Sequence, residues 1–139
     1  MNLSYTEHYE RLVALITHLG ATDKASRTPT RIAKDLGFIK SEVESTLKGF
    51  PAYFRESRKQ SEKVTSKGDK FFTLHLRYSR RNIDKKTEEN SQPLLTEEID
   101  MLIGLVTHML EQEQENSRAF SSLEQSYKNL EGTNKNTML

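Results

Sequence analysis

The residues best suited to specific chemistry lie in one short stretch, residues 40–48. Hydroxyl, carboxylate and ammonium groups fall on one side of a helical repeat there. Serine hydroxyls hydrogen-bond base edges or phosphates, glutamate accepts from the cytosine amino group, and lysine binds phosphate or guanine. The stretch therefore predicts a surface able to bind nucleic acid. The side chains expected to face solvent on it are Lys40, Ser41, Glu42, Glu44, Ser45 and Lys48.

A second polar group stands at the start of the preceding helix. The free N–H groups at a helix N-terminus favour an anion, so contact with a phosphate is one interpretation of this group. Ordinary capping by the threonines, with the arginines solvated, is the other. The residues are Arg27, Thr28, Thr30 and Arg31.

Basic residues are frequent between residues 57 and 81. A run of charge is usually only a solvated surface, but this one lies where the tip of a β-hairpin is expected. If such residues neutralise about five phosphates, binding should fall steeply with salt. Those expected to contact a polyanion are Arg58, Lys59, Lys63, Lys67, Lys70 and Arg77.

The sequence lacks the residue patterns of enzymes and metal sites. It has no Cys, which excludes disulfides, thiolate nucleophiles and zinc sites that need sulfur. Its four His residues are scattered without metal-ligand spacing, and there is no Gly-rich phosphate loop. We therefore expect no catalytic activity, no metal and no other cofactor.

The hydropathy of the sequence limits where the protein is expected to lie in the cell, and its charge limits what it is expected to bind. No apolar run reaches 18 residues and the first residues form no apolar signal region, so we expect a cytoplasmic protein, nucleoid-associated if bacterial, without a membrane partner. Residues 1–83 hold 16 Lys/Arg and 9 Asp/Glu, a net charge of +7, whereas residues 84–139 hold 5 and 11, a net of −6. One end is thus attracted to a polyanion and the other is repelled.

Two helices are expected to precede the 40–48 stretch. The first covers residues 5–19, where apolar residues recur at helical spacing, with a capping box at its start and Gly20 as its stop. The second begins with Thr28 as N-cap and Pro29 at its first position and ends near Leu36. Gly37 then allows a left-handed turn, and Phe38 should enter the core.

The third helix and a hairpin follow. Ser41 and Glu44 form a second capping box, which places this helix from Ser41 to about Gly49. Capping is therefore the alternative role for these two residues. Residues 53–55 are expected to form a first strand, and residues 71–78 alternate as a half-buried second strand.

The C-terminal third has the pattern of a coiled coil. After a polar linker at residues 84–95, a helix is expected over residues 96–131, and residues 132–139 are expected to be a disordered tail. Glu113 and Asn116 interrupt its apolar seam, either as a polar layer or as a break between two helices. A helix of this length must project from a small domain, so a second copy should cover the seam. The residues assigned to this dimerisation are Ile99, Leu102, Val106, Met109, Phe120, Leu123, Tyr127 and Leu130.

Two short helices, the turn between them and the hairpin form one pattern over residues 5–81. The residues that carry this pattern are Ile32, Ala33, Leu36, Gly37, Val43, Leu47 and Phe50, followed by the hairpin. The pattern resembles the winged helix-turn-helix superfamily, in the general form of small bacterial regulators that dimerise through a C-terminal helix. The resemblance implies a fold that is mainly α with a small β-hairpin wing (α+β), residues 1–83 forming the DNA-binding domain. It also implies that the third helix enters the major groove while the wing reaches the flanking backbone.

We therefore expect a homodimeric, sequence-specific transcriptional regulator of double-stranded DNA. Repression by occlusion at an inverted-repeat operator is favoured because no separate effector domain is evident, and no small-molecule effector is expected. One alternative is a winged-helix protein–protein adaptor, favoured by Glu42 and Glu44. A further alternative, a plasmid or phage replication or partition factor, shares the same site chemistry.

Overall fold

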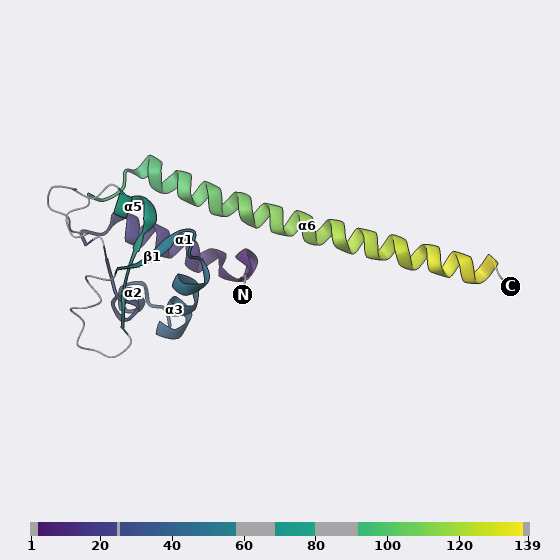
Figure 1. Cartoon of the computed structure of the whole chain (residues 1–139), viewed down its shortest axis with the longest axis horizontal. Coiled ribbons are helices and arrows are strands. Elements are labelled where there is room, and N and C mark those ends of the chain that lie inside the picture. The colour runs from purple at the N-terminus through teal and green to yellow at the C-terminus, as the bar shows by residue number, and fades with distance from the viewer. Residues whose placement is uncertain (1–2, 25, 58–68, 80–91, 138–139) are drawn as a thin grey trace.

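The computed structural model describes residues 3–24, 26–57, 69–79 and 92–137. The fold is mainly helical with one antiparallel hairpin and a long C-terminal helix, in agreement with the expected α+β class (Figure 1). We call everything before the last helix the head. The elements are α1 (Tyr5–Ala21), α2 (Pro29–Leu36), α3 (Lys40–Gly49), β1 (Phe54–Ser57), β2 (Phe71–Leu74), α5 (His75–Ser79) and α6 (Thr96–Thr137).

Helix α1 forms the centre of the core, and four of its apolar residues are fully buried: Leu12, Leu15, Ile16 and Leu19. Ser4 caps its start by accepting from the Glu7 N–H, as predicted. The predicted stop at Gly20 is wrong, because the helix continues to Ala21 and Gly20 is buried within it. A Cβ at Gly20 would lie 3.0 Å from Ile99 Cγ1, so the glycine allows α6 to approach closely.

Helices α2 and α3 meet at the predicted turn. Thr28 caps α2, and Gly37 has a φ of 73°, in the left-handed region that favours glycine. The predicted capping box at Ser41 is wrong, because α3 begins one residue earlier, at Lys40. Ile39 is the extended N-cap residue, and its carbonyl already accepts from the Glu42 and Val43 N–H groups.

The hairpin is shorter than its sequence pattern suggests. Strand β1 begins at Phe54, and its register with β2 pairs Phe54 with Leu74 and Ser57 with Phe71. Arg27 adds a third backbone partner, because it exchanges two hydrogen bonds of 3.0 and 2.8 Å with Phe72. The predicted strand over residues 71–78 is half wrong, since its second half is the helical turn α5.

That helical turn places Arg77 against the carboxyl end of α1. The guanidinium is fully buried, and its Nη1 donates to the Leu19 carbonyl at 2.8 Å and to the Lys24 carbonyl at 3.4 Å. Nη2 donates to the Asp23 carbonyl at 3.5 Å. A cation at this end of a helix satisfies terminal carbonyls and opposes the negative pole of the helix dipole. Tertiary packing thus stops β2 early.

The first half of α6 packs along α1 (Figure 1). Ile99 and Val106 are buried in the same core as α1, Leu102 is half-buried against it, and the Tyr9 hydroxyl lies 2.8 Å from Thr107 Oγ1. The assignment of Ile99, Leu102 and Val106 to a dimer seam is therefore wrong. The apolar stripe of α1 covers them within one chain, so no second copy is needed there.

Glu113 is neither a polar layer nor a helix break, because α6 runs through it without interruption. Its carboxylate accepts from Ser4 Oγ at 2.7 Å, from the Tyr5 N–H at 2.8 Å, and from the Thr6 Oγ1 and N–H at 2.7 and 3.1 Å. Burial raises the pKa of Glu113, but these hydrogen bonds outweigh it and lower the pKa to about 2. Glu113 therefore caps α1 from another element.

The Glu113 contact predicts a stability that depends on pH. Glu113→Gln should lower the free energy of unfolding at pH 7 by about 1 kcal/mol, because the neutral amide interacts less with a helix N-terminus. The folded pKa lies below the ordinary value of 4.5, so the stabilisation is present above that pH and is lost as the pH falls toward about 2. Urea unfolding should show the gap between the two proteins closing over this range.

The matched control is Glu111→Gln, since Glu111 is exposed on the same helix. It should unfold like the parent chain at every pH. A Glu113→Gln gap that stays the same size at the acidic end of this range would contradict the contact.

The second half of α6 projects well beyond the head (Figure 1). It continues to Thr137, so the predicted helix end at residue 131 and the disordered tail are wrong for residues 132–137; residues 138–139 lie outside the described ranges.

The predicted linker at residues 84–95 lies partly outside the described ranges, because residues 84–91 are not among them. Leu94, which the structure describes, is buried, and its N–H donates to the Gly20 carbonyl at 2.8 Å. None of the described helices is long and apolar enough to cross a membrane.

Candidate nucleic-acid interface

Helix α3 has one buried and one exposed face. Val43, Thr46 and Leu47 are buried, and Thr46 Oγ1 lies 3.0 Å from His8 Nδ1 on α1. Burial first, and the nearby Arg11 charge second, lower the pKa of His8, which favours the neutral ring in this contact. The exposed face carries most of the set predicted for it, with Glu44 half-buried: Lys40, Ser41, Glu42, Ser45 and Lys48.

Ion pairs cross the start of this face. Lys40 Nζ lies 3.9 Å from a carboxylate oxygen of Glu44 and 3.9 Å from one of Asp69. Glu42 lies 3.5 Å from Arg11 of α1. Exposed pairs of this kind contribute only about 0–1 kcal/mol, so an incoming phosphate can exchange with the carboxylates around Lys40.

The start of α2 is already occupied by groups of the chain itself. Thr28 Oγ1 accepts from the Arg31 N–H at 3.2 Å, and Asp69 accepts from the Thr30 N–H at 3.4 Å. The Arg31 guanidinium lies 3.3 Å from Asp35. A carboxylate therefore stands where a phosphate was expected, as the helix dipole favours. Sequence reasoning missed Asp69 because Gly68-Asp69 resembles an ordinary hairpin turn.

Two predicted DNA contacts face inward instead. Arg27 is half-buried, its backbone pairs with Phe72, and its Nη2 donates to Thr22 Oγ1 at 3.2 Å. Arg77 is fully buried and caps α1. The prediction that Arg77 contacts DNA is therefore wrong, and Arg27 has a structural role. Nothing in a local window marks Arg77 as buried, because its carbonyl partners lie 53 to 58 residues away in the sequence.

The hairpin offers fewer described cations than its sequence suggests. Lys70 is exposed, and its Nζ lies 3.9 Å from Glu56. The Arg55 guanidinium stacks over the Tyr78 ring, 3.5 Å from its centroid. Four residues predicted to bind DNA lie outside the described part of the chain: Arg58, Lys59, Lys63 and Lys67.

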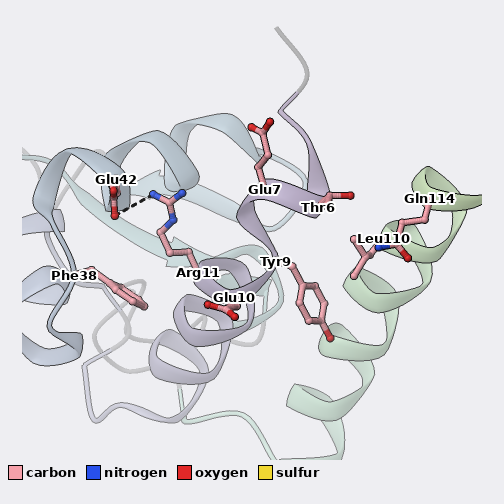
Figure 2. Close-up of a pocket in the computed structure, with 9 residues that line it drawn as sticks. All are labelled: Thr6, Glu7, Tyr9, Glu10, Arg11, Phe38, Glu42, Leu110 and Gln114. Carbon is pink, nitrogen blue, oxygen red and sulfur yellow. Dashed lines mark ion pairs between the residues drawn. The ribbon is translucent and has the colours of Figure 1, made fainter. Parts of the chain in front are cut away.

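A pocket of about 420 Å³ borders α3 where α1, α3 and α6 meet. Figure 2 shows Arg11 extending from α1 toward Glu42 of α3, with Glu7 and Glu10 on the same helix as Arg11. Three carboxylates and one guanidinium make this pocket unfavourable for a phosphate. We therefore assign no phosphate to this pocket.

Comparisons with family models, with curated proteins and with solved structures found no match for this chain. Within the described ranges, no group of three or more His, Asp or Glu side chains is arranged to hold a metal ion. The function is therefore inferred from the arrangement of α3 and the residues around it.

Proposed function

We propose that this chain is a homodimeric, sequence-specific DNA-binding regulator that places the exposed face of α3 in the major groove. A winged helix-turn-helix is the fold we propose for the head. Its support is the element order: three helices, a left-handed turn between the second and third, and a hairpin joined by a bridging residue, Arg27, that precedes α2.

The observation that carries the proposal is the contrast between the two faces of α3. The inner face is held rigidly by the core, through Val43 and Leu47. The outer face presents Ser45 and Lys48 to solvent, and both types read base edges or bind phosphates. A rigid helix with a polar outer face suits direct readout, because the groove admits one helix and its side chains.

The proposal predicts the effect of replacing two residues together. Ser45→Ala with Lys48→Ala should weaken binding to a selected duplex by about 1–3 kcal/mol for each base that is no longer read, and should relax sequence preference. Affinity is measured for a duplex selected from a random pool and for a scrambled duplex at the same salt. Lys128→Ala, which removes the same charge from the projecting helix, is the control. An equal reduction in affinity for both duplexes would contradict base reading.

A protein–protein adaptor is the second candidate, favoured by the acidic pocket beside α3. Glu7, Glu10 and Glu42 would suit a basic partner better than a phosphate. Titration with random duplex DNA at low and moderate salt separates the two functions. A DNA-binding protein should lose affinity steeply as salt rises, whereas an adaptor should bind weakly at both salt concentrations.

A further inference from the structure

An exposed apolar stripe runs along α6 beside the face that packs on α1. Its members are between 38% and 70% exposed and fall within one sector of about 100° at 100° per residue. From the first to the last they span about 44 Å at 1.5 Å per residue. The stripe differs from the predicted seam because it includes two residues of the docked half that were not assigned to it. It consists of Met101, Leu105, Met109, Phe120, Leu123, Tyr127 and Leu130.

The two halves of this stripe differ in shape. At the end of the docked half, bordered on α6 by Met109, Gln112 and Asn116, lies a groove of about 520 Å³, which we call the α6 groove. Apolar groups of the head, including Leu3, Phe50 and Pro51, face Met109 across it. The projecting half has no flanking element within the described ranges but carries two large aromatic side chains, Phe120 and Tyr127. The docked half therefore borders a groove, whereas the projecting half carries large aromatic side chains.

An antiparallel pair of α6 helices brings these halves together. With a two-fold axis at Asn116, four of the seven stripe residues meet one another as apolar pairs, and Asn116 lies opposite the partner's Asn116. The partner's Phe120 then lies opposite Gln112, which borders the α6 groove. A parallel pair would place groove against groove and aromatic against aromatic, leaving the groove unfilled. The antiparallel pairs are Leu105 with the partner's Tyr127, Met109 with the partner's Leu123, and Gln112 with the partner's Phe120.

We propose that the exposed stripe binds the same stripe of a second copy of this chain, antiparallel and centred on Asn116, with the partner's Phe120 in the α6 groove. Polar residues at the centre of such a pair set its register. This inference deepens the homodimer of the proposed function and rests on that part of it alone.

The arrangement has a consequence for DNA binding. Each head contacts its own α6 from Ile99 to Glu113, and in this register the centres of the two contacted segments lie about 30 Å apart along the helix axis. The two heads therefore lie on opposite sides of the two-fold axis at Asn116, as in dimers that bind inverted repeats.

Cysteine cross-linking tests the relative orientation of the two α6 helices. The chain has no native Cys, so any disulfide must join the introduced residues. Met109→Cys and Leu123→Cys are prepared as separate full-length chains, one with a mass tag, and oxidised singly and as a mixture. We expect the mixture to give a cross-linked heterodimer while each variant alone gives at least ten-fold less product. Strong cross-linking of either variant alone would show parallel pairing and overturn the proposal.

Sedimentation of the unmodified chain and of Phe120→Ala completes the test. We expect a dimer whose dissociation constant rises at least ten-fold in Phe120→Ala and is unchanged in Arg118→Ala, a control on the other side of α6. A chain that sediments only as a monomer, or a dimer that forms no cross-link, would overturn the proposal. A cross-linked heterodimer that fails to bind any selected duplex would instead overturn the DNA-binding function and leave the dimer standing.

Discussion

Replacing Val106 with Asp should lower the free energy of unfolding by about 3–5 kcal/mol, because it buries a charge without a partner. Val106 is fully buried in the core shared by α1 and α6. The chain can avoid this buried charge by protonating the carboxyl group or by releasing α6 from α1. Either change lowers the free energy of unfolding. Urea unfolding, followed at a concentration where the chain is monomeric, measures the effect.

Leu123→Asp is the matched control for this prediction. Leu123 is 70% exposed on the projecting part of α6, so its replacement should change monomer stability by less than about 0.5 kcal/mol. It should instead weaken dimers. If Val106→Asp left monomer stability unchanged and only abolished dimers, Val106 would belong to the intermolecular seam, contrary to the structure.

Replacing Arg77 with Leu should lower the free energy of unfolding by about 3 kcal/mol. The aliphatic side chain keeps much of the volume but leaves the carbonyls of Leu19, Asp23 and Lys24 without the guanidinium that bonds them. Removing a buried cation from the carboxyl end of α1 also removes a favourable interaction with the helix dipole. Thermal and urea unfolding should both detect the lower stability.

Arg31→Leu makes the same chemical change at an exposed ion pair and should alter stability by less than about 0.5 kcal/mol. If Arg77→Leu instead kept full stability but lost affinity for DNA, the buried role of Arg77 would be wrong. The contrast between the two arginines therefore separates a structural cation from a surface one.

Helix α1 links these results, because other elements cap both of its ends. Glu113 of α6 holds its N-terminus and Arg77 of α5 holds its C-terminus. Each charge opposes the nearer pole of the helix dipole. Neither contact can be read from α1 itself, since the two residues lie 58 or more positions from these partners.

The sequence predicted features that depend on a few neighbouring residues. The start of α2 at Thr28 and Pro29 and the turn at Gly37 follow from side-chain capping and backbone geometry that act within about four residues. The same local reasoning failed at Ser41, where Ile39 took the cap position. Most of the exposed face of α3 was predicted correctly, with Glu44 the exception, because one apolar face of a short amphipathic helix must be buried.

By itself, the sequence determined where the first helices begin, where the chain turns, and which face of α3 meets solvent. Only the tertiary structure decided that Gly20 admits α6, that Arg77 is buried, and which apolar residues of α6 are left exposed. The physical reason is the distance along the sequence over which each effect acts. Capping and backbone torsion depend on residues close in the sequence, whereas burial depends on which distant segment packs against a residue. An apolar stripe shows that it needs a partner, but packing decides whether that partner is α1 or a second copy.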